Sequence, residues 1–219
     1  METEVKLSFK DKESLNNVTL TDSFRKYCLD LNSSPMLLEN SYLDTTDKTV
    51  LSRGGSARVR HVSGDNTDYY EQTVKYKGGA SSGLHQRYEW NVRTDSISFS
   101  IDEFKKNAAT DGDPLEYLDV IFEGLESTDL IILCFNSFYR TTYKLKYGNS
   151  IIEACVDSGI IKSSVSAKTD EICELELELI EGDVNDLTSL KELIIKENEC
   201  VPLDKSKFMR TLALAMGNR

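Results

Sequence analysis

Two stretches near the ends of the chain alternate charged and uncharged side chains with a period of two. The first is ETEVKL at residues 2–7, and the second is ELELEL at residues 174–179. This spacing predicts two β-strands, each with one charged face. Like charges on one strand face repel one another unless a cation lies between them. The pattern therefore predicts a carboxylate-lined site for a divalent cation, built where the two ends of the chain meet in one sheet.

The composition narrows the class of protein. The 219 residues are 39% hydrophobic and 29% charged, which is enough for one large domain with a sizeable core. No apolar stretch approaches the roughly 20 residues of a membrane helix, and the first residues lack the apolar segment of a signal peptide. Five cysteines without a CxxC spacing predict reduced thiols, and two histidines argue against a zinc site.

The net charge of −11 argues against a general nucleic-acid-binding surface, although it does not exclude an anionic small molecule. We therefore expect a cytoplasmic protein with one domain over residues 1–219, whose partner is neither a membrane nor a nucleic acid. The oligomeric state stays open, with a homodimer as one alternative.

Most of the chain predicts strands joined by polar turns, with helices between some of them. Further strands are expected at residues 38–44, 57–62, 69–76, 86–93, 131–135, 137–147, 150–158, 159–167 and 172–180. A turn is expected at residues 77–83. Helices are expected at residues 14–28, 101–108, 113–125, 189–197 and 205–215.

The middle strands carry basic residues on one face, whereas the acidic residues gather on the two terminal strands. Arg58 and Arg60 share one face of a strand, and Arg140 shares a face with Lys144. In an open sheet such faces would simply be solvated. The alternative is a closed barrel with a polar interior, whose apolar outer faces are covered by helices. Cations inside it would bind a polyphosphate, and carboxylates would hold a metal ion bridging to it.

Nine short motifs occur in the same order as in a known family. They are ETEVK at residues 2–6, YLDT at 42–45, RVR at 58–60, QTVK at 72–75, RYE at 87–89, FYR at 138–140, EACVDSG at 153–159, ICELELEL at 172–179 and KSK at 205–207. Together they resemble the CYTH superfamily, the triphosphate tunnel metalloenzymes, and within it the bacterial inorganic triphosphatases.

The resemblance implies an α+β fold that is mainly β: a closed eight-stranded antiparallel β-barrel forming a tunnel, with helices packed outside. It also implies dependence on Mg²⁺ or Mn²⁺. The implied reaction is hydrolysis of inorganic triphosphate (tripolyphosphate) to pyrophosphate and orthophosphate. Three alternatives stay open: a class IV-type adenylate cyclase, a thiamine or nucleoside triphosphatase, and a non-catalytic polyphosphate-binding module.

Three departures from the family pattern bear on these alternatives. The His-Phe pair that precedes ExExK in class IV cyclases is absent, because Met1 directly precedes Glu2. Arg140 is followed by Thr141, where the family often has two adjacent basic residues. The helical, histidine-rich second domain of many family triphosphatases is also not expected within these 219 residues.

The resemblance assigns roles to charged residues within the matched motifs. Substrate binding is assigned to cations, whose donors suit phosphate oxygens: Lys6, Arg58, Arg60, Lys75, Arg87, Arg140 and Lys205. Metal binding is assigned to carboxylates: Glu2, Glu4, Glu89, Asp157, Glu174 and Glu176, with Glu178 as an alternative. Catalysis is assigned to Glu4, which would orient the attacking water, together with Lys6 and Lys75. Cys155 is expected to be a buried, inert thiol.

Overall fold

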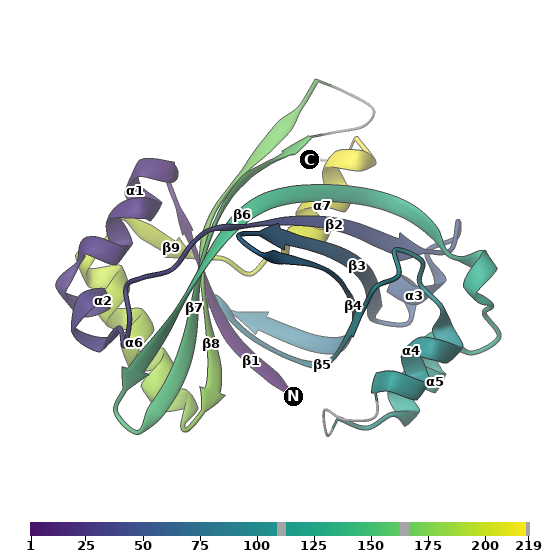
Figure 1. The fold of residues 1–219 in the computed structure, drawn as a ribbon, viewed down its shortest axis with the longest axis horizontal. Coiled ribbons are helices and arrows are strands. Elements are labelled where there is room, and N and C mark those ends of the chain that lie inside the picture. Colours follow the sequence, from purple (N-terminus) through teal and green to yellow (C-terminus); the bar gives the residue numbers. More distant parts are fainter. Residues whose placement is uncertain (109–112, 163–166, 218–219) are drawn as a thin grey trace.

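The main chain closes on itself as a β-barrel. The computed structural model describes residues 1–108, 113–162 and 167–217. Eight strands follow one another in the order β5-β4-β3-β2-β6-β7-β8-β1, every pair is antiparallel, and β1 returns to β5 (Figure 1). The predicted closed eight-stranded antiparallel barrel is therefore confirmed. The strands are β1 (Glu2–Phe9), β2 (Met36–Asp44), β3 (Gly55–Gly64), β4 (Thr67–Ser81), β5 (Leu84–Thr94), β6 (Ile131–Tyr147), β7 (Ser150–Lys162) and β8 (Thr169–Glu181), with a short β9 (Cys200–Pro202) beside β1.

The two strands with alternating charge are neighbours in this barrel. Lys6 of β1 lies opposite Glu176 of β8, and Glu4 lies opposite Glu178. Because side chains alternate along a strand, the charged residues of both strands share the inner face, and Val5 and Leu177 share the outer face. The chain ends therefore meet as the sequence predicts.

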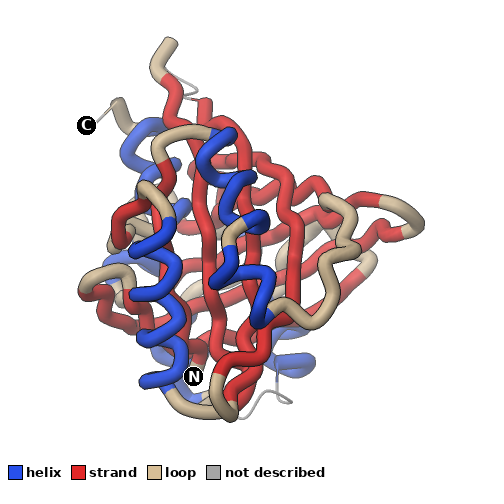
Figure 2. Tube along the Cα trace, turned by 90° about the vertical axis from the view of Figure 1, so that its left-hand side faces the viewer, coloured by secondary structure: helices blue, strands red, loops and turns tan. Residues whose placement is uncertain are grey.

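Helices cover the apolar outer faces of the barrel on two sides (Figures 1 and 2). Around one core, Leu7, Leu175 and Ile194 pack together beneath the first group of helices. Around the other, Trp90 and Phe104 pack beneath the second group. The first group is α1 (Lys12–Asn17), the 3₁₀ helix η1 (Val18–Leu20), α2 (Asp22–Tyr27) and α6 (Val184–Glu197); the second is α4 (Ile101–Asn107) and α5 (Glu116–Phe122). The one-turn α3 (Thr49–Ser52) follows β2, and the 3₁₀ helix η3 (Ser127–Asp129) precedes β6.

Helix α7 (Lys207–Ala215) packs differently, because it contacts side chains that point into the barrel. Leu212 packs with Tyr42 of β2 and Cys134 of β6, and the Phe208 ring contacts Tyr42 at a tilt of 31°, with ring centroids 4.9 Å apart. Ser206 caps the helix by accepting a hydrogen bond from the Met209 amide. The last helix therefore fills part of the barrel interior rather than covering its outside.

Two long strands were predicted as pairs of shorter ones. β6 runs unbroken through Asn136, and β7 runs unbroken through Gly159. Glycine occupies this position within the strand because there is no room for a side chain: a Cβ atom at residue 159 would lie 2.6 Å from the Cβ of Phe138. Part of the strand predicted at residues 159–167 falls on residues 163–166, which lie outside the described residues.

Other boundaries also differ from the prediction. The turn expected at residues 77–83 is mostly strand: β4 passes through a bulge at Lys77, which has a φ of 41°, and continues to Ser81. The helix expected at residues 14–28 is broken at η1. α6 begins before the predicted Ser189, because Asp183 caps it by accepting a hydrogen bond from the Asn185 amide.

Two further sequence expectations concern cysteines and membrane helices. All five cysteines are unpaired in the structure. Among the helices of the described residues, none combines the length and the apolar character that crossing a membrane requires.

Candidate active site

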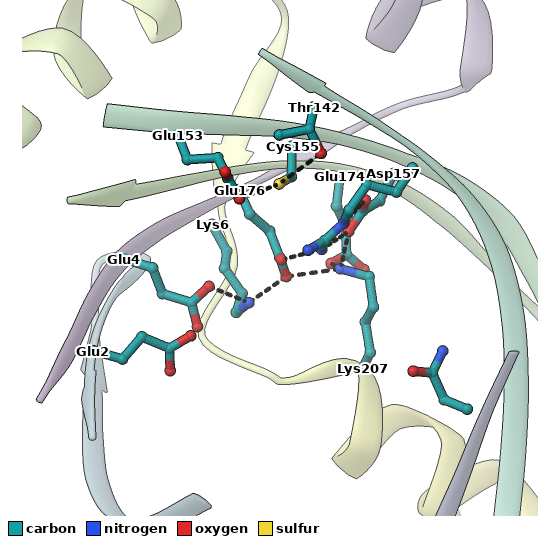
Figure 3. A network of polar contacts seen from close by, with 12 residues as sticks. Glu2, Glu4, Lys6, Thr142, Glu153, Cys155, Asp157, Glu174, Glu176 and Lys207 are labelled. Carbon is teal, nitrogen blue, oxygen red and sulfur yellow. Dashed lines mark hydrogen bonds and ion pairs between the residues drawn. The ribbon is translucent and has the colours of Figure 1, made fainter. Parts of the chain in front are cut away.

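The barrel interior holds a cavity of about 280 Å³ lined almost entirely by polar and charged side chains. Seven of the eight barrel strands contribute charged side chains to its wall, and α7 contributes from one end. The charged lining residues are Glu2, Glu4, Lys6, Arg58, Arg60, Glu71, Lys75, Arg87, Glu89, Arg140, Glu153, Glu176, Glu178 and Lys207. Figure 3 shows several of these side chains pointing toward one another from β1, β7, β8 and α7. The closed barrel therefore encloses acidic and basic groups together.

One group of ion pairs lies where β1 meets β5. Glu2 accepts hydrogen bonds from Lys75 at 3.0 and 3.1 Å and from Arg87 Nε at 2.6 Å. Arg87 also contacts Glu4, and Lys75 contacts Glu89. Burial alone would raise the pKa of Glu89, but Lys75, a hydrogen bond with Glu2 and the charge of Arg58 together outweigh it and lower that pKa to about 2. These carboxylates are therefore held by cations from neighbouring strands.

A second group lies where β8 meets β7 and α7 (Figure 3). The Lys207 ammonium lies 2.8 Å from Asp157, 2.7 Å from Glu174 and 2.8 Å from Glu176. Arg140 forms a two-pronged pair with Asp157 at 2.7 and 2.6 Å, and its Nη2 also lies 2.5 Å from Glu176. Burial alone would raise the pKa of Glu176, but Lys207, Lys6 and Arg140 outweigh it and lower that pKa well below its usual range.

Glu178 lies between these groups and has a different environment. Burial, and then the nearby carboxylates of Glu2, Glu89 and Glu4, raise the pKa of Glu178 to about 8. Its opposite residue on β1 is Glu4, another acid. This part of the wall therefore carries more carboxylates than its cations balance, which is the arrangement that a bound cation would stabilise.

The opposite wall, formed by β3 and β4, carries Arg58 and Arg60. Arg58 donates to the Thr73 hydroxyl at 2.7 Å, while its buried Nε has no hydrogen-bond partner in the structure. Arg60 donates from Nε to the Asn40 side chain at 2.7 Å. Burial, and then the charges of Arg58 and Arg140, lower the pKa of Arg60 to about 10. Neighbouring guanidinium groups that repel one another and retain spare donors suit an anion with several oxygens.

A model of the CYTH domain matches residues 1–212 of the chain. The chain belongs to the CYTH family. An inorganic triphosphatase from Haemophilus influenzae is 29% identical to this CYTH domain over 175 residues, which are 80% of this chain and 45% of that protein. The chain thus spans less than half the length of this curated relative.

Solved structures with the same fold have lower sequence identity to this CYTH domain. A putative adenylyl cyclase from Hippeastrum, described as having a dominant triphosphatase activity, has a TM-score of 0.67 and 17% identity, with 100% of this chain and 97% of that chain covered. A putative adenylate cyclase from Bacillus halodurans has a TM-score of 0.54 and 16% identity, covering 96% and 98%. At this identity these likenesses show the fold.

The structure brings nearly all residues predicted for the site into the CYTH barrel. The predicted residues that line the cavity are Glu2, Glu4, Lys6, Arg58, Arg60, Lys75, Arg87, Glu89, Arg140 and Glu176. Asp157 and Glu174 are fully buried beside Lys207. Lys205 is exposed and lines an adjoining, larger cavity of about 1120 Å³ beside α7, which shares Lys75, Arg87 and Ser206 with the charged cavity. Cys155 is buried, and burial raises the pKa of its thiol to about 12, as expected for an inert side chain.

Sequence reasoning missed two cations that α7 brings to the carboxylates. Lys207 belongs to the KSK motif, but the prediction chose Lys205, two positions earlier. Arg210 contacts Glu174 and donates to Asp170 at 2.7 Å. Helical spacing is the signal that identifies both residues, because Lys207 and Arg210 lie three positions apart on one face of α7. Glu71 was also missed; it lies 3.4 Å from Arg58 and 3.8 Å from Arg60.

The carboxylates of this CYTH domain fit a hard divalent cation in chemistry. All candidate donors are oxygens, which Mg²⁺ and Mn²⁺ prefer, and the wall around Glu178 has an excess of negative charge. Within the described ranges, no three acidic, cysteine or histidine residues already converge on one point. The ligands would therefore turn away from cation partners such as Arg87 and Lys75 when a metal binds.

Proposed function

We propose that this CYTH domain hydrolyses inorganic triphosphate to pyrophosphate and orthophosphate inside the barrel, in a reaction that depends on Mg²⁺ or Mn²⁺. The observation that carries the proposal is the cavity inside the barrel, in which the wall that carries Arg58 and Arg60 faces the carboxylates of β1 and β8. The name of the 29% identical relative, inorganic triphosphatase, supports the same substrate.

The basic wall would bind the substrate. A linear triphosphate presents oxygens along its whole length, so it needs cations spread around a tunnel rather than one anion-binding loop. Arg58 and Arg60 would grip it from β3, and Arg140 from β6. Four further cations would contact the triphosphate by giving up part of their contact with carboxylates: Lys6, Lys75, Arg87 and Lys207. We give Lys207 the role that the sequence analysis gave to Lys205, because Lys207 lines the charged cavity inside the barrel and Lys205 lines the adjoining one.

The acidic wall would hold the metal and orient water. Glu2, Glu4, Glu89 and Glu176 would supply oxygen ligands. The sequence analysis also assigned Asp157 and Glu174 to the metal, but both are fully buried and paired with Lys207, and Asp157 also with Arg140, so we assign them to fixing these cations instead. A bound divalent cation would neutralise charge on the phosphoryl group being transferred. We assign Glu4 to orient the attacking water, because it is buried and anchored by Lys6 at 2.8 Å.

Lysine side chains would stabilise the negative charge that develops as the phosphoryl group is transferred to water. The water oxygen forms a bond to a terminal phosphorus while the bond from that phosphorus to the bridging oxygen breaks. Pyrophosphate leaves with the bridging oxygen and takes one proton of the water, and the other proton stays on the orthophosphate. Lys6 and Lys75 would stabilise the charge that develops during this exchange, which is the main contribution of a protein to phosphoryl transfer.

Substrate choice is tested by comparing products. Purified protein is incubated with tripolyphosphate, ATP or thiamine triphosphate in Mg²⁺ or Mn²⁺, and the products are separated by ion-exchange chromatography. The proposal predicts the fastest release of orthophosphate from tripolyphosphate. Cyclic AMP and pyrophosphate from ATP would instead identify a cyclase. Binding of tripolyphosphate without any cleavage would identify a polyphosphate-binding module.

A further inference from the structure

A chain of buried hydrogen bonds joins the basic wall to helix α7. Arg60 Nε donates to Asn40 Oδ1 at 2.7 Å, and Asn40 Nδ2 donates to Asn136 Oδ1 at 3.0 Å. Asn136 Nδ2 then donates to the Thr211 hydroxyl at 2.8 Å, and that hydroxyl donates to the Lys207 carbonyl at 2.7 Å. Every link points in the same direction, from the guanidinium to the main chain of Lys207.

The strand register places the first three members in one row. Asn40 of β2 lies directly opposite Arg60 of β3 on one side and Asn136 of β6 on the other. Asn40, Asn136 and Thr211 are at most 2% exposed. Leaving any one of these buried polar groups without its partner costs free energy of folding. We therefore expect the hydrogen bonds of this chain to form together.

The chain of hydrogen bonds ends at Lys207, whose ammonium group lies among buried carboxylates. Thr211 holds the main chain of Lys207 at the first turn of α7, and the Lys207 ammonium contacts Asp157, Glu174 and Glu176. The other end of the chain holds Arg60, whose remaining donors face the cavity. The hydrogen-bond chain thus connects Arg60, on the β3 wall of the cavity, to Lys207, which enters the cavity from α7 at one end.

We propose that Asn40, Asn136 and Thr211 are positioning residues that couple binding of a phosphate chain at Arg60 to the placement of Lys207 by α7. The inference rests on the proposed function, because it takes a triphosphate as the ligand of Arg60. When these hydrogen bonds are intact, Arg60 and Lys207 are held at a fixed separation, so a linear anion long enough to reach both is bound by a preorganised pair. Losing the hydrogen bonds would make the position of Lys207 less fixed without removing any cation.

Thr211→Val tests this coupling. Valine keeps the shape of threonine but has no hydroxyl, so both the Asn136 and the Lys207 links are lost. Tripolyphosphate binding is measured by calorimetry at matched metal concentration. We expect a loss of affinity of about 10-fold, in the range for a residue that orients a ligand-binding group. Thr211→Ser, which restores the hydroxyl, should recover affinity to within about threefold.

A matched control separates positioning from helix stability. Thr188 on α6 donates to the carbonyl four residues earlier, as Thr211 does, but α6 lies outside the barrel. Thr188→Val should therefore leave tripolyphosphate affinity unchanged. A double-mutant cycle with Lys207→Met gives the second readout: once Lys207 is gone, Thr211→Val should have little further effect on affinity.

The outcomes distinguish this inference from the proposed function. If Thr211→Val lowers the melting temperature but leaves affinity unchanged, or if its effect adds fully to that of Lys207→Met, the chain is only structural and the inference is overturned. If the wild type binds tripolyphosphate without cleaving it, the proposed hydrolysis fails while the binding test of the coupling still stands. If the wild type binds no tripolyphosphate, both are overturned.

Discussion

At the scale of single residues, the interior of the barrel is organised by carboxylates with contrasting environments. Glu176 is surrounded by Lys6, Arg140 and Lys207, whereas Glu178, two positions later on the same strand face, has mainly carboxylate neighbours. The same residue type is therefore stabilised as an anion at one position and destabilised at the next. This contrast leads to two predictions.

The first prediction concerns turnover. Glu176→Gln removes a carboxylate that is a candidate metal ligand and leaves the three cations around it without their shared partner. We expect tripolyphosphate turnover to fall by at least about 100-fold, at or above the usual range for losing a metal-binding residue. Glu171→Gln, on an exposed position of β8, is the control. Near-normal turnover by a Glu176→Gln protein with a wild-type circular dichroism spectrum would contradict the assignment of Glu176.

The second prediction concerns pH. The pKa of Glu178 is about 8 in the folded protein and near its ordinary value of 4.5 when unfolded. Between these pH values the folded state binds more protons, so the free energy of unfolding should fall as pH rises from 4.5 through 8. Glu178→Gln removes this contribution. The free energy of unfolding of the variant should therefore rise relative to that of the wild type between pH 5 and pH 9. Because Glu178 is only partly buried, we expect this relative rise to be about 1–2 kcal/mol.

Urea unfolding in EDTA measures this effect without bound metal. Glu181→Gln, at the exposed end of the same strand, is the matched control and should follow the wild type at every pH. If wild type and Glu178→Gln have the same pH dependence, the carboxylates around Glu178 are farther apart in solution than in the structure.

At the scale of elements, buried polar side chains decide where strands and helices begin and end. Asp44, at the end of β2, is 1% exposed, and its carboxylate accepts hydrogen bonds from the amides of Thr45, Val50 and Leu51 at 2.7 to 2.9 Å. It therefore holds the one-turn helix α3, which is too short to be stable alone. Asp44 therefore stabilises the local fold, although it lies in the YLDT motif that resembles the family pattern.

Asp44→Asn should destabilise the protein without affecting the cavity. The amide can accept fewer of these hydrogen bonds and brings donors into a site that holds only donors. The expected loss is about 2–3 kcal/mol in the free energy of unfolding, measured with urea. Asp47→Asn, an exposed position in the same loop, should have almost no effect. A loss of tripolyphosphate affinity in a folded Asp44→Asn protein would mean that Asp44 also serves the site.

The sequence predicts the strands better than it predicts their ends. Alternation identifies β1 and β8, since it depends only on which face of a strand is buried. It fails at Asn136 and Gly159, where residue preference argues against a strand but tertiary contacts keep the strand intact. The hydrogen bond from Asn136 to Thr211 joins residues 75 positions apart, and no local pattern reveals it. Helical spacing groups Lys207 with Arg210, but which face of α7 meets the barrel depends on long-range packing, and the prediction of Lys205 did not account for it.

At the scale of the whole molecule, the barrel brings together cations that lie far apart along the chain. Arg58, Arg60, Lys75 and Arg140 all line one cavity, although they come from three strands and span more than 80 positions. The bound triphosphate would relieve repulsion among the cations that lack a full set of acidic partners. Ligand binding should therefore stabilise the whole barrel, since every strand that lines the cavity is held by the same ligand.

Thermal denaturation tests this global effect. Tripolyphosphate at 100 times its dissociation constant, with a metal that supports binding but slows turnover, should add about 2.7 kcal/mol of stability. For a domain of this size, that corresponds to a rise of roughly 5–10 °C in melting temperature. Orthophosphate at the same concentration should have a much smaller effect, because it reaches only a few of the cations.

Arg60→Ala should shrink the shift caused by tripolyphosphate. Its effects on ligand-free stability oppose each other, because it relieves repulsion from Arg58 and Arg140 but leaves the buried Asn40 Oδ1 without its donor. Arg25→Ala, on the exposed surface of α2, is the matched control. If Arg60→Ala unfolds the protein and leaves the ligand shift unchanged in the remaining folded fraction, Arg60 is a structural residue and its assignment to the substrate is wrong.

We propose that the charged interior cleaves triphosphate only when a divalent metal is bound. The decisive measurement is phosphorus NMR of tripolyphosphate, followed in Mg²⁺, then in excess EDTA, and then after Mg²⁺ is restored. We expect orthophosphate and pyrophosphate to form in equal amounts, cleavage to stop in EDTA, and cleavage to resume when Mg²⁺ is restored. Cleavage that continues unchanged in EDTA, or intact tripolyphosphate throughout, would contradict it.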